Sequence, residues 1–205
     1  MLAIVSPAKK IDTTDLTRAL PHTKAVFSQE SQELVEAVRK MSKSELQNMM
    51  KISDALTDLN FHRFKDFAVK ETKANAKQAV MAFAGDTYVG LEAKTLDDYD
   101  LNYAQDRLRI LSGLYGVLRP LDLIQPYRLE MGRRLDTEQA SDLYGFWDSR
   151  IGDALEKDVK SHKAAVLVNL ASVEYFKAIQ PKIRSTRIIT PVFKEEKNGV
   201  AKVLG

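Results

Sequence analysis

The sequence predicts a mixed α/β fold, with α+β character towards its end, in which helices flank one central sheet. Short apolar runs of strand length alternate with longer segments whose apolar residues recur at helical spacing. Near the C-terminal end, Asn198-Gly199 joins two strand-like runs, which is a strong signal for a β-hairpin. No stretch of the 205 residues has the composition of a linker, so we expect one domain spanning residues 1–205.

Five short apolar runs predict the strands. The first is Leu2 to Val5, which stops at Ser6-Pro7 and has the length and composition of a buried strand. The other four runs are residues 79–83, 164–170, 187–193 and 200–204. We expect the last two to form the terminal hairpin.

Apolar residues three or four positions apart predict the helices. These segments are residues 28–41, 44–59, 95–111, 143–159 and 174–179. Ser42 or Ser44 can cap the second helix, and Thr95 can cap the third. The third helix has acidic residues in its first turn and Arg107 and Arg109 in its last, which suits the helix dipole.

Composition excludes several kinds of site. The chain has no cysteine, which excludes disulfides, thiolate zinc sites, iron–sulfur clusters and a cysteine nucleophile. His22, His62 and His162 lack metal-ligand spacing, so we expect neither a metal site nor a cofactor. No apolar run approaches the roughly 20 residues that span a bilayer, and the apolar run before Ser6 is too short for a signal peptide. We therefore expect a cytoplasmic protein without a membrane partner, and we favour a monomer.

Charge is distributed unevenly along the chain, although the net charge of +3 is mild. Residues 1–104 carry 14 Lys and Arg against 15 Asp and Glu, whereas residues 105–205 carry 17 against 13. Residues 175–194 include five basic side chains and no acidic one. The second half either forms a basic face that binds an anion or carries ordinary solvated charges.

The segment L-S-G-L-Y-G-V-L-R-P-L-D, residues 111–122, holds two glycines between apolar stretches. Gly113 can end a helix at positive φ, Gly116 allows another surface to approach closely, and Pro120 is tolerated in the first turn of a following helix. The pattern is similar to a helix-hairpin-helix element, whose backbone N–H groups bind phosphate. Three arginines close in sequence can add positive charge: Arg107, Arg109 and Arg119. The alternative is an ordinary turn between two helices.

Polar side chains follow three of the predicted strands. Because residues just past the strand ends tend to meet at one edge of an α/β sheet, we expect these side chains to share a crevice. The side chains are Lys9, Asp86, Tyr88, Ser172, Glu174 and Lys177. Amines, carboxylates and hydroxyls are the groups of a general acid/base or phosphate site, although they match no known catalytic triad or phosphate loop.

The run from Pro126 to Gly132 contains a pair of opposite charges. Arg128 and Glu130 are two residues apart, so they share one face if the run is extended. They either pair with each other or line a cleft.

Five stretches carry a resemblance to a known family. They are S-P-A-K at 6–9, A-F-A-G-D-T-Y-V-G-L at 82–91, the block L-R-I-L-S-G-L-Y-G-V-L-R-P-L-D-L-I-Q-P-Y-R-L-E-M-G at 108–132, N-L-A-S-V-E-Y-F-K at 169–177 and P-V-F-K-E-E-K-N-G at 191–199. In this order they resemble the YaaA family of bacterial peroxide-stress proteins over essentially the whole chain.

The resemblance implies a function that composition does not give. Family members are cytosolic, protect against hydrogen peroxide by limiting free iron, and are associated with DNA binding through a helix-hairpin-helix-like element and a basic cleft. Transferred to this chain, the implied contacts to the DNA backbone are Arg107, Arg109, Ser112, Gly113, Tyr115, Gly116, Arg119, Arg128, Lys177 and Lys182. No reaction is established for the family, so the alternative is an enzyme that acts on a nucleotide or nucleobase-like ligand in the predicted crevice.

This chain departs from the pattern of the family at its C-terminal end. Family members usually continue for several dozen residues beyond the equivalent of Leu204, with a basic segment and an aromatic-glycine block. This chain stops at Gly205. We therefore expect it to lack the C-terminal segment of the family and, with that segment, part of the basic cleft.

Overall fold

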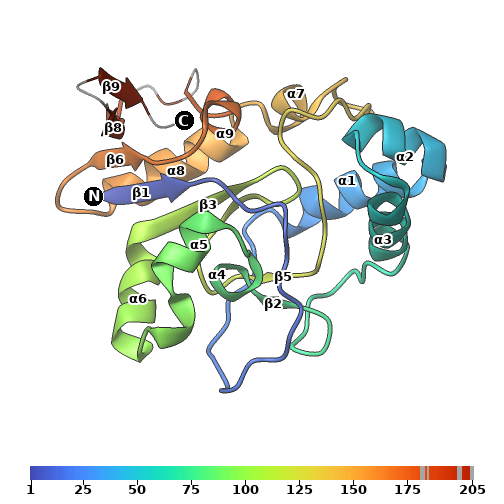
Figure 1. The fold of residues 1–205 in the computed structure, drawn as a ribbon, viewed down its shortest axis with the longest axis horizontal. Helices are drawn as coiled ribbons and strands as arrows, with labels where there is room; N and C mark the ends of the chain where they lie inside the picture. The colour runs from blue at the N-terminus through green and yellow to red at the C-terminus, as the bar shows by residue number, and fades with distance from the viewer. Residues whose placement is uncertain (181–182, 184, 198–199, 204–205) are drawn as a thin grey trace.

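The computed structural model describes residues 1–180, 183, 185–197 and 200–203, and a five-stranded sheet forms its centre (Figure 1). The strand order is β4-β3-β1-β6-β7, with β1 at Leu2–Val5, β3 at Leu108–Ser112, β4 at Gly116–Leu118, β6 at Val166–Asn169 and β7 at Arg187–Ile189. β1 runs parallel to β3 and β6, and β6 runs parallel to β7. β4 is an antiparallel edge strand. The mixed α/β fold class that the sequence predicts is confirmed.

β1 lies in the middle of the sheet, where its sequence suits it. Leu2 and Ile4 are completely buried, because a central strand of a parallel sheet is covered on both faces. Ala3 pairs with Leu108 of β3 on one side and with Val168 of β6 on the other. The strand predicted at residues 2–5 is therefore present with those bounds.

Three helices gather at one end of the molecule (Figure 1). They are α1 at Ser28–Arg39, α2 at Lys43–Met50 and α3 at Asp54–Lys65. Ser42 caps α2 in a capping box with Glu45, as one of the two predicted caps. The helix predicted at 44–59 is divided in two, because Lys51 adopts a left-handed conformation with φ of 54° and ends α2. None of the helices in the described part of the chain is both long enough and apolar enough to cross a membrane.

The strand predicted at residues 79–83 is wrong. The short strand β2 (Lys77–Gln78), which pairs with β5 (Leu123–Ile124), leads into the helical turn α4 (Ala79–Ala82). All four residues of α4 are buried. A short run that is apolar on every side fits a buried helical turn as well as a buried strand, so periodicity does not separate the two.

The helix predicted at residues 95–111 is correct only in its first part. After α5 (Asp86–Leu91) and η1 (Ala93–Thr95), α6 covers Asp98–Arg107. The chain then enters β3 directly at Leu108. Asp97, rather than Thr95, caps α6 by accepting a hydrogen bond from the backbone N–H of Asp100. Ile110 and Leu111 are buried in the sheet between β1 and β4, and Leu108 is partly buried, so these residues do not lie on a helix face.

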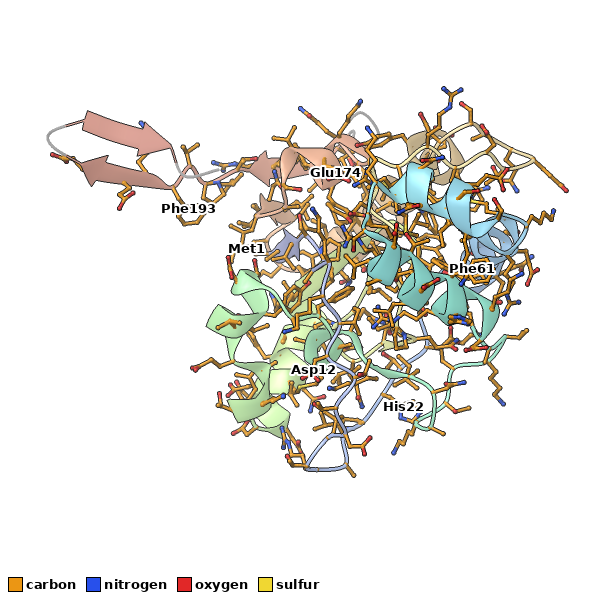
Figure 2. The ribbon with its side chains drawn as sticks, turned by 45° about the vertical axis from the view of Figure 1, so that its right-hand side comes forward. Met1, Asp12, His22, Phe61, Glu174 and Phe193 are labelled. Atoms are coloured by element: carbon orange, nitrogen blue, oxygen red, sulfur yellow. The ribbon has the colours of Figure 1, made fainter. Side chains whose placement is uncertain are left out.

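The C-terminal third contains the predicted helices and strands with changed bounds, but the predicted pairing of the runs at 187–193 and 200–204 is wrong. The strand at 187–189 pairs with β6 in the central sheet, and residues 194–197 supply the first strand of the hairpin instead. The helix predicted at 143–159 is α7 (Leu143–Trp147) and α8 (Arg150–Lys160), separated at Asp148 with φ of 37°. α9 covers Val173–Lys177. β8 (Lys194–Lys197) and β9 (Val200–Val203) form an antiparallel hairpin that extends away from the body of the molecule (Figure 2). The predicted turn at Asn198-Gly199 lies outside the described residues.

A carboxylate fixes the loop that follows β1. Asp12 Oδ1 accepts hydrogen bonds from the hydroxyl of Thr14 at 2.6 Å and from its backbone N–H at 2.9 Å. Lys94 lies 3.1 Å from Asp12 Oδ2, and Lys77 lies 3.5 Å from Oδ1. The hydrogen bond from the Thr14 hydroxyl is the main reason that the pKa of Asp12 lies well below its ordinary value, with the lysines contributing in the same direction and partial burial opposing.

Replacing Asp12 with asparagine should lower the free energy of unfolding by about 1 to 2 kcal/mol at pH 7. Because the folded-state pKa is depressed, this stabilisation is complete above the unfolded pKa of about 3.9 and is lost as the pH falls towards the folded value. Urea unfolding of both proteins at pH 7, 4 and 2.5 measures it. A difference that stays constant across these pH values would contradict the assignment.

Candidate ligand-binding crevice

The carboxyl ends of β1 and β6 open at the same edge of the sheet. β1 continues into the segment from Ser6 to Lys9, and β6 continues through Leu170 into the first turn of α9. The two strands are parallel neighbours, and the backbone N–H of Leu170 donates to Ile4 O at 2.9 Å. Ligands of parallel α/β sheets bind at this edge, so the predicted convergence of post-strand residues has its structural basis here.

Two serines join the two segments. Ser6 Oγ accepts a hydrogen bond from the backbone N–H of Ser172 at 2.9 Å and donates to Ser172 Oγ at 3.1 Å. The hydroxyl of Tyr88 also donates a hydrogen bond to the backbone carbonyl of Ser6 at 2.8 Å. Burial, with a smaller contribution from the neighbouring Tyr127, raises the pKa of Tyr88 well above its ordinary value, so this phenol remains a neutral donor.

An extended segment completes a cavity at this edge. The cavity has a volume of about 190 Å³ and is lined by residues 6–9, 127–130, 172, 174 and 175. Tyr127 contributes its ring while its hydroxyl is 2.6 Å from Ser112 Oγ in the interior. Pro7, Ala8 and Leu129 add apolar surface. The walls of the crevice are therefore about half polar or charged and half apolar or aromatic, which suits a small molecule that has both a flat apolar part and polar groups.

Glu130 is the buried charge of this cavity, with 7% of its side chain exposed. Its Oε1 is 3.0 Å from Arg128 Nη2 and 3.3 Å from Arg133 Nη2. Burial alone would raise the pKa of Glu130, but the hydrogen bonds and charges of the two arginines outweigh burial and lower it below its ordinary value. Glu130 Oε2 is buried and has no hydrogen-bond partner among the residues that the structure describes. Both predicted alternatives for Arg128 and Glu130 hold, because they pair with each other and line the cleft.

α9 forms the other side of the cavity, and Glu174 marks its position in Figure 2. Glu174 Oε1 accepts a hydrogen bond from the backbone N–H of Gly132 at 2.7 Å. The hydroxyl of Tyr144 donates to Glu174 O at 3.1 Å, and Lys177 Nζ lies 4.7 Å from the centre of the Tyr144 ring. Among the residues that the structure describes, no carboxylate lies within 4 Å of the amine of Lys9 or of Lys177.

The structure brings together part of the set predicted for the crevice. Lys9, Ser172 and Glu174 line the cavity. Tyr88 supports it through Ser6, and Lys177 is exposed on the helix that carries Glu174. Asp86 is exposed in the first turn of α5 and does not line the cavity.

The sequence predictions omitted six residues that line the cavity: Ser6, Pro7, Ala8, Tyr127, Leu129 and Tyr175. Ser6 belongs to the S-P-A-K stretch that drew attention to Lys9, and its position directly after β1 was a usable signal. Tyr127 and Tyr175 also line the cavity, but nothing in their sequence context separates them from ordinary core aromatics.

The helix-hairpin-helix prediction for residues 111–122 is wrong in its geometry. β3 and β4 form a tight antiparallel hairpin, in which Ser112 pairs with Gly116. Residues 111–118 are all buried, and the backbone N–H of Tyr115 donates to Ser112 Oγ at 2.8 Å. The backbone groups expected to bind phosphate therefore do not reach the surface. Apolar residues on every side of the glycines favour an internal hairpin over an exposed one.

Gly116 serves a close approach, as predicted, whereas the positive φ predicted for Gly113 is wrong, and Gly113 too serves a close approach. A Cβ on Gly113 would lie 2.2 Å from the backbone oxygen of Leu129. Gly116 has a φ of 68°, and a Cβ there would lie 2.8 Å from the ring of Trp147. The indole Nε1 of Trp147 donates to Gly113 O at 2.9 Å. The groups that approach the hairpin are thus Leu129 and Trp147 in the protein interior and not a bound phosphate.

The arginines near the hairpin are engaged within the protein. Arg109 is 7% exposed, and its Nε lies 2.7 Å from Asp158 Oδ2. Arg119 Nη2 lies 2.9 Å from Asp122 Oδ1. Arg107 Nε lies 2.7 Å from Asp106 Oδ2. Lys182, the remaining predicted DNA contact, lies outside the described residues. Within the described residues, no group of three or more His, Asp or Glu side chains is arranged to hold a metal ion.

Comparisons with known proteins agree with the resemblance seen in the sequence. The family model described as "Peroxide stress protein YaaA" matches residues 1–205. A UPF0246 protein of Saccharophagus degradans is 50% identical over 204 residues, covering all of this chain and 80% of the relative. UPF0246 proteins of Burkholderia lata and Burkholderia mallei are 48% and 47% identical over 206 residues, covering all of this chain and 79% of each relative. The chain belongs to the YaaA family of peroxide-stress proteins.

Proposed function

We propose that this peroxide-stress protein binds a nucleotide-type ligand in the crevice at the carboxyl edge of the central sheet. The observation that carries the proposal is the convergence of Ser6, Lys9, Glu130, Ser172 and Glu174 on one cavity, with two exposed lysines, Lys9 and Lys177, on the segments that border it. The apolar and aromatic walls suit a flat ring, and the lysines suit a phosphate outside it.

The phosphate position follows from the charges. Lys9 lines the cavity, and Lys177 extends from the same helix as Glu174, so both amines belong to the segments that border the mouth. Neither amine has a carboxylate partner among the described residues, so neither must give up an ion pair to bind an anion. Arg128 is less available, because Glu130 already accepts its hydrogen bonds.

Binding of DNA is the second candidate function, with protection against iron-dependent oxidative damage as its proposed consequence. The observation in favour is that unpaired basic residues continue beyond the mouth into adjacent positions: Lys10 follows Lys9, and Arg134 follows Arg133. A phosphate backbone could cross this edge without using the buried hairpin. Such binding would be salt-sensitive and largely independent of base sequence.

Replacing Lys9 or Lys177 with alanine should weaken nucleotide binding about 2- to 5-fold each, the range of an exposed ion pair. Calorimetric titration with AMP, CMP, GMP and UMP measures the effect. Lys163 is a matched control, because it is exposed and precedes β6, at the opposite edge of the sheet. Lys163→Ala should leave affinity unchanged, and an equal loss in all three variants would remove the crevice from the proposal.

The same variants separate the two candidates. If the partner is a duplex, labelled DNA should bind more tightly than any mononucleotide, with an affinity that falls steeply as salt rises. Lys9→Ala and Lys177→Ala should then reduce the salt slope by about 0.9 per lost phosphate contact. Absence of a duplex shift at low salt, together with measurable mononucleotide binding, favours the first candidate.

A further inference from the structure

Glu130 has one carboxylate oxygen that no group of the described chain satisfies. The residue is 5% exposed, lines the crevice cavity, and has two arginines on Oε1, while Oε2 is buried without a partner. Buried acceptors in proteins are almost always paired, so an unpaired oxygen on a residue that lines a cavity indicates a donor that arrives with a ligand.

We propose that Glu130 Oε2 accepts a hydrogen bond from a neutral N–H on the ring edge of the bound nucleobase. The ligand then enters ring first, with its phosphate remaining at the lysines of the mouth. This inference rests on the proposed function and adds to it the residue that recognises the base and the group that the residue recognises.

The donor is neutral because the charge of Glu130 is already balanced. Arg128 and Arg133 both lie within 3.3 Å of Oε1, so the cluster of three side chains carries a net positive charge. An ammonium group or metal ion placed at Oε2 would meet the repulsion of both guanidinium groups. A neutral ring N–H supplies the missing hydrogen bond without adding charge.

Glu130 remains an acceptor at neutral pH. The arginines keep the pKa of Glu130 below its ordinary value despite burial, so the carboxyl group is ionised and has no proton to donate. The other hydroxyl near the floor of the cavity is occupied, because Tyr127 bonds to Ser112 at 2.6 Å. Among the buried side-chain atoms of the described residues, Glu130 Oε2 is the one from the cavity lining that has no hydrogen-bond partner, and a ring N–H can satisfy it.

The test compares nucleotides that differ in one donor. AMP, CMP, GMP and UMP are each titrated beside the counterpart that is methylated at every nitrogen donor of the Watson–Crick edge. The wild-type protein should bind the parent of its preferred nucleotide at least about 10-fold more tightly than the methylated counterpart, because methylation leaves Oε2 unsatisfied.

The variant Glu130→Gln separates this hydrogen bond from the bulk of the added methyl group. Arg128 and Arg133 require an acceptor, so they hold the amide oxygen at the Oε1 position and place the amide NH₂ where Oε2 was. A donor then faces a donor, and the preference for the parent nucleotide should fall about 10-fold or more. Steric exclusion alone would leave the preference unchanged, since Gln has the size of Glu.

Glu138→Gln is the control. Glu138 is an exposed glutamate that does not line the cavity. This variant should therefore keep the wild-type preference. Circular dichroism establishes whether Glu130→Gln folds, and if it does not, the wild-type comparison of parent and methylated nucleotides decides alone.

The outcomes distinguish this inference from the function on which it rests. Equal affinity of the wild-type protein for parent and methylated nucleotides overturns the role of Glu130 and leaves nucleotide binding in place. A preference that survives unchanged in Glu130→Gln also overturns it. Failure of all eight nucleotides to bind overturns the proposed function and this inference together, whereas a preference lost in Glu130→Gln and kept in Glu138→Gln supports both.

Discussion

Replacing Gly113 with alanine is expected to destabilise the protein by about 3 kcal/mol or more. The added Cβ would lie 2.2 Å from the backbone oxygen of Leu129 and 3.2 Å from the backbone carbon of Glu130. Because these are backbone atoms, no side chain can rotate away to make room, and the hairpin or the segment at 127–130 must move. Chemical denaturation of the variant and the wild type measures the loss.

Gly90→Ala is the control for this experiment. Gly90 lies exposed in helix α5, and a Cβ there would have nothing within 4 Å. Alanine favours helix over glycine by about 1 kcal/mol, so this variant should be as stable as the wild type or more stable. If Gly113→Ala unfolds at the same denaturant concentration as Gly90→Ala, the hairpin does not pack against Leu129 as described.

Replacing Trp147 with alanine is expected to cost about 3 to 5 kcal/mol, the range for truncating a large buried aromatic residue. Trp147 is completely buried, its ring packs against Gly116, and its ring centre lies 5.4 Å from that of Phe27. Its indole N–H is also the donor to Gly113 O, so truncation leaves a cavity and an unpaired carbonyl. Thermal and denaturant unfolding both measure the effect.

Two further variants help to separate the contributions to the stability that Trp147→Ala is expected to lose. Trp147→Phe removes the N–H and part of the ring, and should lose about 1 to 3 kcal/mol. Tyr99→Ala truncates an aromatic side chain that is 77% exposed on α6, and should change stability by no more than about 0.5 kcal/mol. Equal losses for Trp147→Ala and Tyr99→Ala would contradict the role of Trp147 as a core residue.

The fold was predictable where the apolar pattern had one interpretation. The run at residues 2–5 is too short for a helix, and it is a strand with those bounds. The run at 79–83 is apolar throughout and became a buried helical turn, because its four buried residues satisfy either geometry. The end of α6 and the start of β3 at Leu108 could not be predicted from the local sequence. The change from helix to strand is set by pairing with β1, which is distant in sequence.

Part of the candidate site was also predictable from the sequence. Lys9 and Glu174 meet because residues past parallel strands share an edge, a rule that needs only the order of the elements. Gly116 indicated a close approach, but a glycine in the sequence does not say what approaches it or that Gly113 serves the same purpose. Only the folded chain shows that Leu129 and Trp147 do so.

The contact between Gly113 and Leu129 gives stability and ligand affinity a common origin. Leu129 and Glu130 line the crevice, and behind them the backbone of Gly113 follows with no side chain between. Trp147 in turn holds Gly113 from the far side. A substitution that loosens this stack would displace the crevice wall as well as weaken the core. Selection for a tighter or a broader ligand would therefore act through residues deep in the interior, and variants of altered affinity should also differ in melting temperature.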